Sequence, residues 1–191
     1  MTNQSTKICD EQTFASLVEA IQQGADDEVA RTDRLLVEYP GDARLHFLRG
    51  SLLAGLGRPI EALPALRKAV ELAPDFAIAR FQLGFFLLTS GEAVEALSVW
   101  GPLAMLPKDH YLRMFVAGLT HLIRDEFEET IRLLEQGIGA NSENPPLNRD
   151  MQLIIDEVRG LQVGASAGQG DDSVSATSFL LNQFGAKPTK H

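Results

Sequence analysis

The sequence predicts an all-α fold in which pairs of helices repeat along the chain and a flexible C-terminal tail follows. Glycines recur at a constant step at Gly50, Gly84 and Gly118 (84 − 50 = 34 and 118 − 84 = 34). A phenylalanine precedes each of these glycines by three positions, and a turn residue follows each by seven. An internal period of this length is typical of helical repeat proteins, in which each repeat packs on its sequence neighbours.

Composition and charge exclude several classes of function. The chain has 191 residues, of which 45% are hydrophobic and 23% charged, as in ordinary soluble domains. Because the formal net charge is −9, we expect no nucleic-acid partner, which would require a basic surface. The sequence has no apolar run long enough to cross a membrane and no signal-peptide pattern, so we expect no membrane association and a cytoplasmic protein.

The first part of the chain, residues 10–42, predicts a helix pair that is a degenerate copy of the repeat. Asp10 is a plausible N-cap for a helix with an apolar stripe at i, i+3, i+4 and i+7, and Gly24 ends it. A second helix is expected from about residue 26 to residue 38. Pro40 and Pro74 share the repeat step (74 − 40 = 34), which links this pair to the repeats that follow.

Three clear repeats are expected over residues 43–76, 77–110 and 111–144. Gly57, Gly91 and Asp125 mark the turn inside each repeat. In the second repeat, Gly101-Pro102 predicts a kink or an early helix end, because proline removes a donor and crowds the preceding turn. A last helix over residues 145–160 has one apolar face and is expected to cap the final repeat. The helical domain is thus expected to span residues 10–161.

The end of the chain has a different composition. Residues 162–175 are rich in Gly, Ser and Ala and predict a flexible linker. Residues 176–185 predict a short apolar helix, and residues 186–191 are expected to be disordered. The apolar side chains of this tail could themselves act as a ligand, and they are Phe179, Leu180, Leu181 and Phe184.

The pattern of small and large residues within each period resembles the tetratricopeptide repeat (TPR). The resemblance covers residues 43–144 well and residues 10–42 loosely, and the third repeat departs from the pattern because it lacks the closing proline. It implies a right-handed α-α superhelix, the TPR solenoid. The residues that carry it include Leu83-Gly84 for the L-G pair, and Ala62…Leu66, Ala96…Trp100 and Thr130…Leu134 for the A-x₃-F slot.

In TPR proteins, the first helix of each repeat lines a concave groove that binds peptides, and the resemblance implies a groove here. Independently, Phe81, Phe85 and Leu88 lie at i, i+4 and i+7 and therefore share one helix face, separate from the face that carries Gly84. The alternative is that these side chains only form core. The predicted peptide-binding residues are Phe47, Ile78, Phe81, Phe85, Leu88, Leu112, Phe115, Leu119 and Leu122.

The same positions indicate the chemistry of the ligand. TPR relatives that capture acidic C-termini hold them with a clamp of Lys, Asn and Arg side chains, whereas the equivalent positions here lack that clamp. We therefore expect a protein or peptide partner with an apolar segment, either an amphipathic helix or an extended segment. The residues at the clamp positions are Phe47, Ser51, Gln82, Leu112 and Val116.

No pattern of catalytic or metal-binding residues is found. The four histidines are scattered, Cys9 is the one cysteine, and no phosphate-binding, nucleophile-elbow or zinc-protease motif occurs. We therefore predict no catalytic residues, no metal site and no cofactor, and a protein that is not an enzyme.

The sequence thus predicts a non-enzymatic protein-protein interaction module, a scaffold or adaptor with an apolar groove. The groove could hold the tail of its own chain or of a neighbour, and the second arrangement would make a homodimer. The alternative is a chaperone-like adaptor for a hydrophobic client, resembling three-repeat bacterial secretion chaperones. The identity of the partner does not follow from the sequence.

Overall fold

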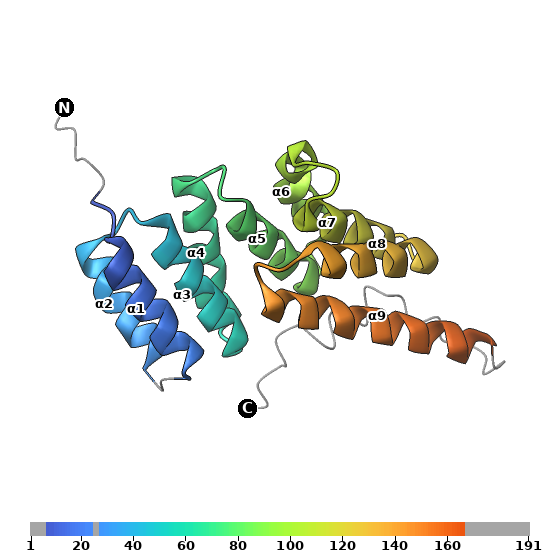
Figure 1. The fold of residues 1–191 in the computed structure, drawn as a ribbon, viewed down its shortest axis with the longest axis horizontal. Helices are drawn as coiled ribbons and strands as arrows, with labels where there is room; N and C mark the ends of the chain where they lie inside the picture. Colours follow the sequence, from blue (N-terminus) through green and yellow to red (C-terminus); the bar gives the residue numbers. More distant parts are fainter. Residues whose placement is uncertain (1–6, 25–26, 167–191) are drawn as a thin grey trace. The chain divides into compact units, whose positions relative to one another are not determined.

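The structure is a computed structural model that describes residues 7–24 and 27–166. Helices account for the regular structure of these residues (Figure 1). The chain divides into two compact units, Met1–Leu83 and Gly84–His191, with the boundary inside one helix. The helices are α1 (Glu11–Gln22), α2 (Glu28–Glu38), α3 (Ala43–Gly55), α4 (Pro59–Leu72), α5 (Ala77–Thr89), α6 (Ala93–Trp100), the short 3₁₀ helix η1 (Gly101–Met105), α7 (Tyr111–Leu122), α8 (Phe127–Ala140) and α9 (Pro145–Ser166).

In the first unit, α1 packs on α2, α2 on α3, and α3 on α4. Asp10 caps α1 as the sequence predicts, since its carboxylate accepts a hydrogen bond from the backbone N–H of Thr13 at 2.9 Å. A small core of Cys9, Leu17 and Leu45 joins α1 to α3. The first two helices thus fall in the region for which the sequence predicts a degenerate helix pair.

The glycines of the 34-residue step lie where two helices of one pair come closest. A Cβ atom added at Gly50 would lie 2.6 Å from Cγ of Leu66. A Cβ added at Gly118 would lie 2.8 Å from Cδ2 of Leu134, and one added at Gly84 would overlap the indole of Trp100. Real Cβ atoms do not approach other atoms this closely, so each position needs glycine. The three side chains in contact are the large residues of the A-x₃-F slot.

The turns inside the three repeats share one backbone conformation. Gly57, Gly91 and Asp125 have φ angles of 67°, 87° and 57°, in the left-handed region. Glycine adopts this region without a steric penalty, and aspartate tolerates it better than most residues. The three turn positions predicted from the repeat register are therefore equivalent in structure.

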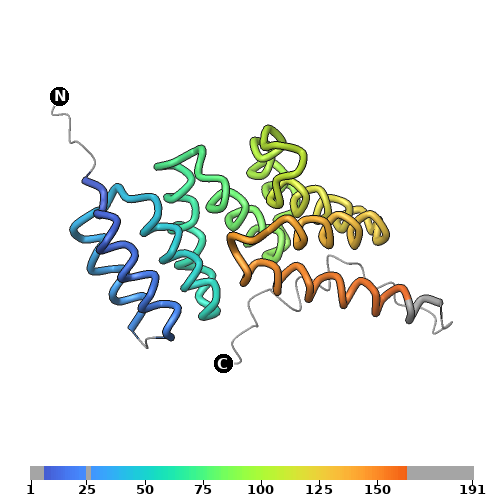
Figure 2. The backbone as a smooth tube through the Cα atoms, in the orientation of Figure 1, coloured from blue at the N-terminus to red at the C-terminus, as the bar shows by residue number. Residues whose placement is uncertain are grey.

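In the second unit, α6 ends early, as the sequence predicts. It stops at Trp100, and the chain continues as the 3₁₀ turn η1 through Pro102. The other helices of this unit pack in chain order, α7 on α8 and α8 on α9. Figure 2 shows α9 running alongside α8.

A network around Asn141 fixes the corner between α8 and α9. The Asn141 side-chain oxygen accepts hydrogen bonds from the backbone N–H groups of Glu143 and Asn144, at 3.1 and 3.0 Å. Its amide nitrogen donates to Asn144 O and to Asn148 Oδ1. Asn141 is 5% exposed, so these bonds satisfy a polar group that has little access to water. The apolar face of α9 then packs through Leu147, Met151, Ile154, Ile155 and Val158.

The end of α9 differs from the expectation. The helix was expected to stop at Gly160 and a linker to begin at residue 162, whereas α9 continues to Ser166. A glycine inside a helix costs about 1 kcal/mol relative to alanine, which is too little to end a helix whose earlier turns are packed. The rest of the predicted linker, residues 167–175, the predicted tail helix 176–185 and residues 186–191 lie outside the described residues.

Candidate functional site

The predicted peptide-binding residues are mostly covered in the structure. Phe47 on α3 and Ile78 on α5 are half-buried. The other seven are at most 5% exposed, and they are Phe81, Phe85, Leu88, Leu112, Phe115, Leu119 and Leu122. A side chain this well covered offers no surface to a ligand unless a neighbouring element moves. That these residues line a groove therefore stays a prediction.

Phe115 shows what one of these side chains contacts. Its ring meets that of Tyr111 edge-on, with the ring centroids 5.9 Å apart. The same ring lies 2.5 Å from where a Cβ atom at Gly137 of α8 would be. Phe115 therefore packs inside the α7–α8 pair, which is a core role. Gly137 makes room for this ring.

Phe47 contacts its own unit through an aromatic pair. Its ring meets that of Phe76 edge-on, with the centroids 5.3 Å apart and an interplanar angle of 64°. Such pairs contribute about 0.5–1.5 kcal/mol beyond the area that they bury. One turn further along α3, the hydroxyl oxygen of Ser51 is buried and has no hydrogen-bond partner. This part of α3 is thus half-covered and carries one unsatisfied polar group.

A second feature of the first unit is a pair of hollows over α3, between α2 and α4. The larger has a volume of about 670 Å³ and the other about 620 Å³, and Asp33 and Arg49 line both. These two side chains form an ion pair, with Arg49 Nε 2.6 Å from Asp33 Oδ1. Val37 and Leu56, both largely exposed, lie at the hollows. The sequence does not predict this surface, and its one signal there is Val37, an apolar residue outside the inward face of α2.

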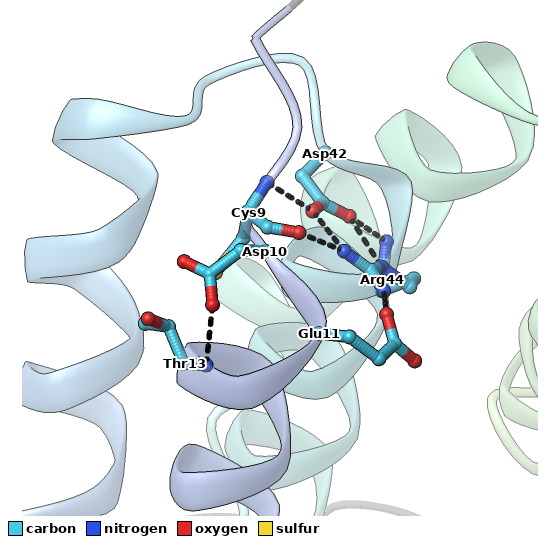
Figure 3. Close-up of polar contacts among 6 residues, drawn as sticks. All are labelled: Cys9, Asp10, Glu11, Thr13, Asp42 and Arg44. Atoms are coloured by element: carbon cyan, nitrogen blue, oxygen red, sulfur yellow. Dashed lines mark hydrogen bonds and ion pairs between the residues drawn. The ribbon is translucent and has the colours of Figure 1, made fainter.

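The third feature is a charged cluster at the start of α1 and α3, shown in Figure 3. The Asp42 side chain is 2% exposed, and it accepts hydrogen bonds from the backbone N–H groups of Cys9 and Arg44 at 3.0 Å each. The Arg44 guanidinium donates to Asp42, to Glu11 at 2.6 Å and to the Cys9 carbonyl oxygen at 2.6 Å. Arg44 also lies over the ring of Phe14.

The pKa directions in this cluster indicate a structural role. Burial alone would raise the pKa of Asp42, but the hydrogen bonds from Arg44 and Cys9 outweigh it and lower that pKa. Burial raises the pKa of the Cys9 thiol, which disfavours the reactive thiolate. Asp42 is therefore held as a carboxylate paired with Arg44, Cys9 is held as a thiol, and the cluster ties the start of α1 to α3.

No group of three or more His, Cys, Asp or Glu side chains in residues 7–24 and 27–166 is placed to hold a metal ion. None of the helices in those ranges has the length and hydropathy of a membrane span. The predicted tail ligand, Phe179, Leu180, Leu181 and Phe184, lies outside the described residues.

Comparison with known proteins identifies the fold. The sequence matches no family model and no curated protein. Among solved structures, it is similar to a chain described as "MamA RS-1 ArsTM double mutant", with a TM-score of 0.55 and 15% identity, over 91% of this chain and 93% of that chain. MamA is a TPR protein, and its helices pack in sequential pairs as they do here. The chain therefore has the TPR fold.

Proposed function

We propose that the protein is a non-enzymatic interaction module that binds an apolar peptide or amphipathic helix through the first helices of its repeats. A TPR fold implies protein partners. The observation that carries the proposal is the row of large apolar residues at the groove positions of α5 and α7, together with the lack of the Lys, Asn and Arg clamp that holds acidic termini in relatives. Burying one such side chain against a ligand contributes about 1.5–3 kcal/mol, so contact with a few of them supports useful affinity.

The coverage of these side chains sets a condition on binding. An external ligand must displace or open the elements that cover them, so its apparent affinity is lowered by the fraction of molecules in the closed state. The segment with Phe179 and Phe184 is one candidate for the occupant, in its own chain or in a neighbour. A neighbour's segment would produce a homodimer, which light scattering detects as a doubled mass.

The test uses a fluorescent apolar dye and two variants that place glutamate at the same point of a helix. Ile78 is the second residue of α5 and half-buried, whereas Val94 is the second residue of α6 and 85% exposed. A carboxylate is favourable in a first helical turn, so neither substitution should unfold the chain. Ile78→Glu is expected to weaken dye binding about tenfold through lost apolar contact, and Val94→Glu to leave it unchanged.

A second arm tests the tail as the occupant. The double variant Phe179→Glu/Phe184→Glu is expected to increase dye binding if this segment covers the apolar face. Unchanged binding would exclude the segment as occupant and leave the groove itself intact. Equal binding by Ile78→Glu and the wild type, with thermal unfolding unaltered, would rule out the groove. A chaperone-like adaptor would additionally suppress aggregation of an unfolded client, and loss of that activity in Ile78→Glu would favour this alternative.

A further inference from the structure

Asp150 on α9 is a half-buried carboxylate that has no partner among the residues that the structure describes. Leu147, three residues before it, and Ile154, four residues after it, are 4% and 0% exposed. Residues at these spacings lie next to each other on a helix surface, so Asp150 borders the face of α9 that packs in the core. No hydrogen bond or ion pair joins its carboxylate to any residue in the described ranges. Burial raises the pKa of Asp150, with no compensating interaction.

The position fits a cation. A carboxylate that has lost water costs free energy unless a charged donor replaces the lost hydrogen bonds. An ammonium group supplies both the charge and up to three N–H donors. Asp156, also on α9, differs from Asp150 in both respects. Its side chain is exposed and accepts a hydrogen bond from the side-chain amide of Gln152 at 2.8 Å. Asp150 is thus distinguished by its burial and by its lack of a donor.

An exposed apolar side chain lies beside it. Leu153 follows Asp150 by three residues, so the two are neighbours on the helix surface, and Leu153 is 47% exposed. It also continues the repeat register, because Leu119 of the predicted groove lies one step earlier (153 − 119 = 34). Together they present one carboxylate and one apolar group to a ligand.

The chain contains a segment with the complementary chemistry. Residues 173–191 include Phe179, Leu180, Leu181 and Phe184, followed by Lys187 and Lys190, and contain no Asp or Glu. The formal charge of this segment is +2, so the remaining residues carry −9 − 2 = −11. Lys187 follows Phe184 by three residues, the same spacing that separates Asp150 from Leu153.

The connecting length allows the contact within one chain. Helix α9 is described to Ser166, and at about 1.5 Å per residue Asp150 lies roughly 24 Å back along its axis. The stretch from Ser166 to Lys187 would span about 25 Å on average as a flexible coil. Lys187 can therefore reach Asp150 without strain in the chain.

We propose that the segment 173–191 docks on α9 of its own chain, with its apolar side chains against Leu153 and the Nζ ammonium of Lys187 donating to the Asp150 carboxylate. This inference rests on the proposed function, since it takes the segment as an internal ligand of the chain, and it places that ligand on α9 instead of on the first helices of the repeats. It adds the chemistry of recognition, in which the ammonium group of Lys187 follows the apolar side chain of Phe184 by three residues.

Amide hydrogen exchange of the full chain, followed by mass spectrometry, tests it. In the wild type, the amides around Phe179–Phe184 are expected to exchange well below the rate of an unstructured peptide. Asp150→Asn and Lys187→Gln should each accelerate this exchange about tenfold, as expected for the loss of a charged hydrogen bond. The charge-reversed double variant Asp150→Lys/Lys187→Asp should restore protection. The matched controls Asp156→Asn and Lys190→Gln should behave as the wild type.

Three outcomes would overturn the inference. Unprotected amides in the wild type would show that the segment does not dock, while the groove would still be judged separately by dye binding to Ile78→Glu. Protection that persists in both Asp150→Asn and Lys187→Gln would show docking without this ion pair. Protection that falls on hundredfold dilution would place the segment on a second copy of the chain. Urea unfolding of Asp150→Asn guards against a folding artefact, because a midpoint close to that of the wild type shows that the helical domain still folds.

Discussion

At the scale of single residues, the glycines of the 34-residue step set how closely the helices of one pair approach. Gly84 is the most demanding, because the Trp100 indole occupies the space that a side chain would need. Trp100 is 1% exposed, so its ring cannot move out of the way without disturbing the core. A glycine at this position is therefore a packing requirement and not a flexible point.

Replacing Gly84 by alanine is expected to lower the free energy of unfolding by about 1–3 kcal/mol, the usual cost of overpacking a core. Gly139→Ala is the matched control, because Gly139 is helical and no atom lies within 4 Å of its added Cβ. That control should be neutral or stabilise by up to about 1 kcal/mol through helix propensity. Urea unfolding of both variants provides the measurement. Equal stability of the two would contradict the close approach of α5 and α6.

At the scale of elements, Asp42 contributes two stabilising contacts at the start of α3. It caps that helix through the Arg44 N–H, and it holds the residues before α1 through the Cys9 N–H. Helix pairs of this length are marginal alone, so such tertiary anchors add to what helix propensity supplies. The first and third helices of the first unit are joined here by polar contacts as well as by core packing.

Asp42→Asn is expected to lower the free energy of unfolding by about 1–3 kcal/mol at neutral pH, because hydrogen bonds to a charged group are lost. The pKa of Asp42 is lowered in the folded state, so the unfolded state binds more protons near its own pKa of about 3.9. The stabilisation is complete above that pH and is lost as the pH falls through the lower folded value. The difference between wild type and variant should therefore shrink below about pH 4.

Urea unfolding across pH 3–7 measures this difference. Asp75→Asn, at an exposed position between α4 and α5, serves as the control and should track the wild type at every pH. A pH-independent difference between Asp42→Asn and the wild type would show that shape, and not charge, accounts for the role of Asp42.

At the scale of the whole molecule, the chain divides into two compact units. In repeat proteins, stability is roughly a sum of the stability of each repeat and of its contacts with its neighbours. A destabilising substitution in such a molecule first lowers the protection of nearby backbone amides against hydrogen exchange.

Hydrogen exchange of Asp42→Asn is therefore expected to accelerate in α1–α4 and to remain unchanged in α7–α9. Each set of helices serves as the internal control for the other within one sample. Acceleration of the same size in both sets would mean that the chain unfolds as a single cooperative body.

Much of the local architecture could be predicted from the sequence. The turn at Asp125 was predicted from register alone, although the other two turns have glycine, and all three share the same backbone region. The early end of α6 at Gly101-Pro102 follows from the covalent geometry of proline. These features depend on residues close together in the chain, so a periodic sequence is enough to reveal them.

Which neighbours cover each side chain was decided by the tertiary structure. The register places Phe115 and Leu119 on α7, but the repeat pattern does not say what packs against each face. Phe115 lies against Gly137 of α8, a contact between residues 22 positions apart (137 − 115 = 22). The continuation of α9 past Gly160 likewise depends on packing of its earlier turns.

The sequence by itself therefore determined the repeat, its turns and the glycines at its close contacts, because these are set by backbone geometry at a fixed period. Only the tertiary structure showed that most predicted groove residues are covered and that Asp150 is half-buried with no donor among the described residues. Burial is a property of everything that surrounds a side chain, and those surroundings come from distant parts of the chain that no local pattern encodes.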